Sequence, residues 1–124
     1  MESIRSKREY GTTYEMSNKN RYLPFELSFT HEQFTKLQNG TFPIEMGDRW
    51  FIFYEDSVLN LHWWSGQCIC KIFLDEKKLK SKQILIVSDE NIKPILSDEM
   101  EISELKSTIK YSLLGGEDFQ ITKI

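Results

Sequence analysis

The residues that could do chemistry are concentrated in one short run, residues 62–66 (HWWSG), near the middle of the chain. Two adjacent tryptophans in an extended segment point to opposite faces of a sheet. One can therefore enter the core, while the other needs a helix, an interface or a ligand to cover it. Trp63 or Trp64 would then offer a flat surface on which a nucleobase can stack, and Arg49 could pair with a phosphate. Packing in the core is the competing interpretation of the tryptophan pair.

Two pairs of carboxylates are the next candidates. Glu55 and Asp56 lie at a predicted turn, and Asp75 and Glu76 follow a strand that ends at the same edge of the sheet. Paired carboxylates can act as general acid and base or hold a divalent ion. The simpler interpretation is that charged residues mark the strand ends, because turns favour them.

A metal site is not predicted, although Cys68, Cys70 and His62 could lie on neighbouring strands. These are three ligands at most, whereas structural zinc sites use four ligands at recognisable spacings. The two cysteines are two residues apart on one predicted strand, so we expect them to face the same way and to be poorly placed for a disulfide. We expect reduced thiols, no metal and no cofactor.

The composition indicates an ordinary globular domain. The chain has 124 residues, 40% of them hydrophobic and 28% charged, which suits a single domain with its own core. Its net charge of -3 argues against general nucleic-acid binding. The first residues lack the apolar core of a signal peptide, and no stretch approaches the ~18 apolar residues of a membrane span. The sequence therefore predicts a cytoplasmic protein that does not contact a membrane.

The predicted fold is α+β, with an antiparallel sheet of about four to five strands. Aromatic and β-branched residues predict a meander over 49–74, with strands at about 49–55, 58–64 and 67–74. A lysine-rich tip then leads into a buried fourth strand at 83–88.

Less regular strands are expected at the two ends of the sheet. Residues 21–29 are expected to form an irregular strand, with Pro24 favouring the edge. Residues 119–124 could return as a short strand.

Two helices complete the predicted domain. Thr30 and Gln33 form the sequence pattern of a capping box before a short helix at 31–38. A C-terminal helix is predicted over 97–114, with acidic residues in its first turn and an apolar stripe facing the sheet. Residues 1–20 are expected to be flexible or ordered by a partner, and 21–124 to form the single domain.

Both faces of the predicted sheet are apolar. Alternation places Trp50, Ile52 and Tyr54 on one face and Phe51 and Phe53 on the other. Because the C-terminal helix can cover one face only, we expect the short helix or a second subunit to cover the other. A homodimer is compatible with this arrangement.

The same stretch resembles a poorly characterised group of small bacterial proteins and domains. Their pattern is W-F-x-[YF]-x-E-x-x-x-L-x-x-H-R-S-W-T-G followed by C-I-x-x-[VI], and the group is loosely associated with ADP-ribosylglycohydrolase contexts. The matching residues here are Trp50, Phe51, Glu55, Leu59, His62, Trp64, Ser65, Gly66, Cys68 and Ile69. This chain has Trp63 in place of the Arg-Ser pair and Ser65 in place of threonine, so an anion-binding role of that arginine does not transfer. The resemblance implies a sheet and a bacterial or phage context.

Three functions follow, in order of preference. The first is a non-enzymatic protein that senses or sequesters a small nucleotide-like ligand, with ADP-ribose derivatives among the candidates. The second is a protein-interaction module, such as an inhibitor or immunity protein, that uses the same aromatic residues as hot spots. The third is a small hydrolase acting through Glu55, Asp56 and His62. The predicted ligand-binding residues are Arg49, Glu55, His62, Trp63, Trp64 and Ser65; no catalytic residue is assigned.

Overall fold

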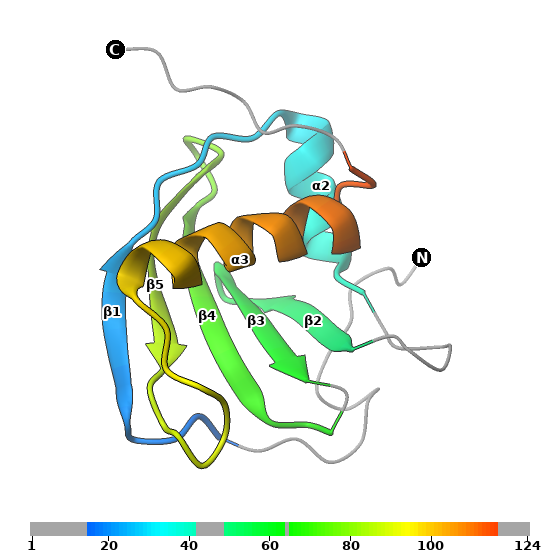
Figure 1. The fold of residues 1–124 in the computed structure, drawn as a ribbon. Coiled ribbons are helices and arrows are strands. Elements are labelled where there is room, and N and C mark those ends of the chain that lie inside the picture. The colour runs from blue at the N-terminus through cyan, green and yellow to red at the C-terminus, as the bar shows by residue number, and fades with distance from the viewer. Residues whose placement is uncertain (1–14, 42–48, 64, 117–124) are drawn as a thin grey trace.

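A computed structural model describes residues 15–41, 49–63 and 65–116, and it confirms the α+β fold. The elements in chain order are β1 (Asn20–Pro24), α2 (His31–Asn39), β2 (Trp50–Glu55), β3 (Val58–Trp63), β4 (Cys68–Asp75), β5 (Lys80–Val87) and α3 (Asp98–Ser112). The strands form one antiparallel sheet in the order β1-β5-β4-β3-β2, and α3 crosses its face (Figure 1). Among the described residues, no helix is long and apolar enough to cross a membrane. The predicted strand at 119–124 and residues 1–14 of the predicted N-terminal arm lie outside the described residues.

The predicted meander is confirmed, and its turns have the expected chemistry. Asp56 and Ser57 connect β2 to β3 with φ values of 53° and 63°, and two successive positive φ values are typical of a type I′ hairpin turn. Gly66 lies between β3 and β4 with a φ of 99°. Its N–H donates to the Trp63 carbonyl oxygen at 2.8 Å, so this reversal depends on a conformation that glycine adopts readily.

The fourth strand of the prediction begins earlier than expected, at Lys80 rather than at residue 83. The lysine-rich tip is correspondingly shorter, and the Asp75 carboxylate accepts the N–H groups of Lys77 and Lys78 there at 3.0 and 3.1 Å. The added strand residues include Ser81, which is fully buried. Its hydroxyl donates to the Phe25 carbonyl oxygen at 2.5 Å. Ser81 thus belongs to the strand although it fits no apolar pattern, because the Phe25 carbonyl group accepts the hydrogen bond of its buried hydroxyl.

The segment after Pro24 continues alongside β5 after β1 has ended. The Ser81 N–H donates to the Leu27 carbonyl oxygen at 2.9 Å, and the Phe29 N–H donates to that of Leu79 at 2.9 Å. Phe25, Leu27 and Phe29 are buried in alternation with more exposed residues. Pro24 lies at the end of an edge strand, where its missing N–H costs no ladder hydrogen bond.

Both helices pack on the same face of the sheet, so the short helix does not cover the opposite face, and coverage of that face by a second subunit stays a prediction. The ring of Phe34 in α2 meets that of Tyr54 edge-on, with centroids 6.2 Å apart. Leu105 and Ile109 of α3 belong to the same buried core as Phe34 and Ile52. The capping box at Thr30 is confirmed, but the cap fixes where α2 begins and not which face it covers.

The second face of the sheet carries its own aromatic cluster. Phe51 and Phe53 are 0% and 1% exposed, and their rings stack with centroids 5.1 Å apart. The His62 ring lies 5.2 Å from that of Phe53 and is also buried. No helix of the described residues lies on this face. Both faces of β2 are therefore buried, as the alternation predicted, although α2 and α3 account for one face only.

Candidate functional site

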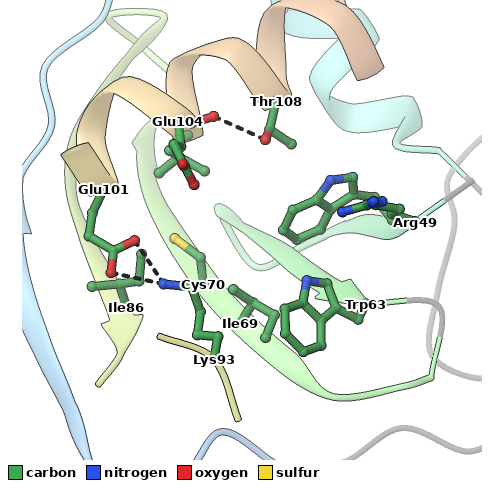
Figure 2. A pocket seen from close by; sticks show the side chains of 11 residues that line it. Arg49, Trp63, Ile69, Cys70, Ile86, Lys93, Glu101, Glu104 and Thr108 are labelled. Carbon is green, nitrogen blue, oxygen red and sulfur yellow. Dashed lines mark hydrogen bonds and ion pairs between the residues drawn. The ribbon is translucent and has the colours of Figure 1, made fainter. Parts of the chain in front are cut away.

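A pocket of about 260 Å³ lies between α3 and the sheet, at the end where β2 begins and β3 ends (Figure 2). Its lining residues come from four strands and the residue just before β2, from the connection between β5 and α3, and from α3 itself: Arg49, Trp50, Trp63, Ile69, Cys70, Ile86, Lys93, Glu101, Glu104, Leu105 and Thr108. Apolar surface with a few converging polar groups is the usual composition of a ligand-binding site.

Two tryptophans form one wall of the pocket. Trp50 and Trp63 are direct cross-strand partners at the open end of the β2–β3 hairpin, so their side chains lie on the same face as neighbours. Both are only partly buried. In Figure 2 the Trp63 indole lies across the pocket from Glu101. The pair therefore gives the pocket an aromatic surface that the core does not fully cover.

A β-bulge places Ile69 and Cys70 in the floor of the pocket. Leu61 pairs with Cys70 while the next residue, His62, pairs with Cys68, so β4 has one extra residue here. Neighbouring residues of β3 face opposite sides, and their partners Cys68 and Cys70 do so too. The prediction that the cysteines face the same way is therefore wrong.

The cysteines are both free and buried. Burial raises the pKa of the Cys70 thiol well above its ordinary value, because the interior disfavours a thiolate. Cys70 therefore contributes an uncharged thiol to the floor.

A buried ion pair closes the opposite end of the pocket. Glu101 is 2% exposed, and its two carboxylate oxygens accept hydrogen bonds from the Lys93 ammonium at 3.0 and 2.9 Å. The Leu96 N–H also donates to this carboxylate, at 3.3 Å. Arg21 lies at the edge of the group, with a guanidinium nitrogen 3.9 Å from Glu101. These contacts tie the connection between β5 and α3 to the helix, so the pair shapes the wall of the pocket.

Two charged side chains of the lining have no such partner among the described residues. Arg49 is exposed just before β2, and Glu104 is exposed on α3. Figure 2 shows Arg49 at the tryptophan side and the Glu104 carboxylate reaching from α3 toward the pocket. The pocket thus offers one cation and one anion on different walls, with aromatic surface between them.

The structure brings together two of the six predicted ligand-binding residues, Arg49 and Trp63, in the pocket. His62 is buried on the opposite face, where its Nδ1 lies 3.0 Å from the Gly66 carbonyl oxygen. Ser65 is exposed in the turn after β3. Glu55 ends β2 at the far end of the hairpin from Trp63. The sixth residue, Trp64, lies outside the described residues.

The histidine of the predicted hydrolase lies apart from its two carboxylates, Glu55 and Asp56. His62 pairs with Phe51, four residues before Glu55, which is about 13 Å along the strand at ~3.3 Å per residue. Asp56 lies in the turn beyond Glu55. Within residues 15–41, 49–63 and 65–116, no group of three or more His, Cys, Asp or Glu residues could hold a metal ion.

The second carboxylate pair does approach the end of β2, as predicted. The Tyr54 hydroxyl donates a hydrogen bond to Glu76. Burial and this hydrogen bond raise the pKa of Tyr54 from 10.0 to about 12. Because folding raises the pKa of Tyr54, its neutral hydroxyl contributes to the stability of the folded state. This contribution is complete below pH 10 and is lost as the pH rises toward 12.

We therefore expect Glu76→Gln to lower the pKa of Tyr54 only partway toward 10.0, because burial, the larger cause, remains. NMR titration of the ring-labelled tyrosines would measure this shift. Glu55→Gln, which removes the exposed carboxylate next to Tyr54 in the sequence, should leave the titration unchanged. If Glu76→Gln also left it unchanged, Glu76 would not be the hydrogen-bond partner.

The sequence-based prediction of the site missed Trp50, Lys93, Glu101 and Glu104. One signal for Glu101 was present, because it precedes Leu105 and Ile109 by four and eight residues and so falls on the buried stripe of α3. A carboxylate on an apolar stripe requires a buried partner. Lys93 could not be chosen as that partner from the sequence, because it lies in an irregular connection.

No protein-family model, curated protein or solved structure matches the chain. The fold and the pocket therefore define the protein only as a small α+β domain with an aromatic-walled cavity.

Proposed function

We propose that this protein binds a small nucleotide-like molecule in the pocket between α3 and the sheet. The observation that carries the proposal is the pairing of Trp50 with Trp63 on one wall, with the guanidinium of Arg49 beside them and without a partner among the described residues. A base would stack on the indole surface, and a phosphate would be held by Arg49 at the open side. Bacterial or phage origin and a sensing or sequestering role are parts of the same proposal.

The size of the pocket favours a mononucleotide over a larger ligand. Its volume of about 260 Å³ lies just below the ~300–1,000 Å³ of pockets that enclose drug-sized molecules. A base with its ribose would fill this space and leave the phosphate near Arg49. An ADP-ribose derivative would place one nucleoside in the pocket and extend the rest over the surface.

A binding role without catalysis is supported by the state of the buried ionisable groups. Lys93 and Glu101 are occupied by each other, and the Cys70 thiol is held uncharged by burial. A general base or nucleophile needs a free lone pair within reach of its substrate. Arg49 and Glu104, which have no side-chain partner within the described part of the chain, are suited to charge recognition.

Trp63→Ala is expected to weaken the binding of nucleoside monophosphates by about 5- to 150-fold, the effect of losing one stacked base. Isothermal titration calorimetry with GMP, AMP and ADP-ribose would measure it. Tyr111→Ala, which removes an exposed aromatic residue of α3 outside the pocket, should leave the affinity unchanged. Absence of binding by the wild type at millimolar ligand, or equal losses in the two variants, would contradict the proposal.

The alternative is a protein-interaction module, and one feature favours it. Tyr22 on the edge strand β1 is 60% exposed, and its ring lies 6.2 Å from that of Phe73. Exposed aromatic residues of this kind are frequent hot spots in interfaces. A partner protein that dissociates on Tyr22→Ala, together with no response to nucleotides, would support this function over ligand binding.

A further inference from the structure

Two carboxylates line the pocket, Glu101 and Glu104, and among the described residues only Glu101 has side-chain partners. The Lys93 ammonium has three N–H donors, and three acceptors surround it: the Pro94 carbonyl oxygen at 3.0 Å and the Glu101 oxygens at 3.0 and 2.9 Å. Glu101 also accepts from Leu96. This pair therefore has no donor left for a ligand, and the Glu101 carboxylate is committed to the protein.

Glu104 is different, although it lies one turn further along the same helix. The Thr108 hydroxyl donates to the backbone carbonyl oxygen of Glu104 at 3.0 Å, not to the Glu104 carboxylate. No described residue forms a hydrogen bond or ion pair with this carboxylate. Figure 2 shows it reaching toward the pocket from α3, on a different wall from Arg49. Glu104 is thus the hydrogen-bond acceptor that the pocket presents to a ligand.

The chemistry of this acceptor selects among nucleobases. An ionised carboxylate has two oxygens that accept and none that donates, so its best complement is an edge with two adjacent N–H donors. The Watson–Crick edge of guanine has such a pair, at N1 and at the 2-amino group. Adenine offers its 6-amino group beside an N1 acceptor, which would face the second carboxylate oxygen without a proton.

We infer that the ligand is a guanine nucleotide, with its base against Trp63 and its donor edge on Glu104. This inference rests on the proposed function, and it adds the identity of the base. The phosphate would pair with Arg49 at the opposite wall, so one end of the ligand would neutralise the guanidinium and the other would donate hydrogen bonds to the Glu104 carboxylate.

The test compares GMP, IMP and AMP by isothermal titration calorimetry on the full chain. The wild type should bind GMP about 5- to 150-fold more tightly than AMP, as expected for one bidentate contact to a base. IMP, which keeps the N1 donor and lacks the amino group, should lie between them. Glu104→Gln should remove most of this preference by weakening GMP binding, because an amide cannot accept two hydrogen bonds side by side. Glu99→Gln, an exposed residue of the same helix outside the pocket lining, should retain it.

The outcomes separate the inference from the proposed function. If AMP binds as tightly as GMP, or if Glu104→Gln keeps the preference, the guanine assignment is wrong. In that case a loss of all three ligands in Trp63→Ala would still support nucleotide binding. If none of the three binds to the wild type, both conclusions fail. Because Glu104 is exposed, unchanged thermal melting of Glu104→Gln would show that the variant folds.

Discussion

Replacing Lys93 with methionine is expected to lower the free energy of unfolding by about 3–5 kcal/mol, the cost of leaving one member of a buried ion pair without its partner. The Glu101 carboxylate would stay 2% exposed, with the Leu96 N–H and the more distant Arg21 as its remaining contacts. Arg21 is already engaged with Asp98 at 3.2 Å, so it can compensate only in part. Urea unfolding followed by circular dichroism would measure the loss.

The double variant Lys93→Met with Glu101→Met is the informative companion. Two well-packed apolar side chains often replace a buried ion pair at little cost. We therefore expect the double variant to be clearly more stable than Lys93→Met alone. Lys106→Met, on the exposed side of α3, should change stability by less than about 0.5 kcal/mol. If Lys93→Met behaved like this surface control, the ion pair would not be buried in solution.

Phe51→Ala is expected to lower the free energy of unfolding by about 3–5 kcal/mol, which is typical of removing a phenylalanine from a packed core. The ring is fully buried on the face of the sheet opposite α2 and α3, where it packs against Phe53 and His62. Its removal would leave a cavity beside two other rings, and the loss of contact adds to the loss of burial. Equilibrium urea unfolding is again the measurement.

Phe73→Ala provides the matched control for this face. The register places Phe73 opposite Val58, on the same side of the sheet as Phe51. It is only partly buried, beside the exposed Tyr22 ring. Its removal should therefore cost clearly less than that of Phe51. Equal costs for the two variants would contradict the difference in burial between the two halves of this face.

Two positions of the pattern that this chain resembles, His62 and Trp63, lie on opposite faces of the sheet. The histidine of that pattern, His62, lies with the aromatic cluster on the second face, and Trp63 takes the place of the Arg-Ser pair in the pocket wall. If a nucleotide binds here, its phosphate would be recognised by Arg49, which lies just before β2. A relation to ADP-ribose chemistry remains a proposal that the ADP-ribose titration above would test.

The elements of this protein were determined by the sequence because their signals are local. Alternating aromatic residues produced β2 with two buried faces, and the turn at Asp56 and Ser57 set its pairing with β3. Thr30 and Gln33 fixed the start of α2 through contacts three residues apart. Such signals act between near neighbours, so no knowledge of the rest of the chain was needed to read them.

Only the tertiary structure decided which surfaces meet. The bulge at Ile69 turned Cys68 and Cys70 to opposite faces, and both helices settled on one side of the sheet. The buried pair of Lys93 and Glu101 joins an irregular connection to a helix. Each of these outcomes depends on contacts between distant segments, whose free energies a local pattern does not encode. Arg49 and Trp63 could be predicted for the site because they flank one hairpin, whereas Glu104 enters it only when α3 packs across the sheet.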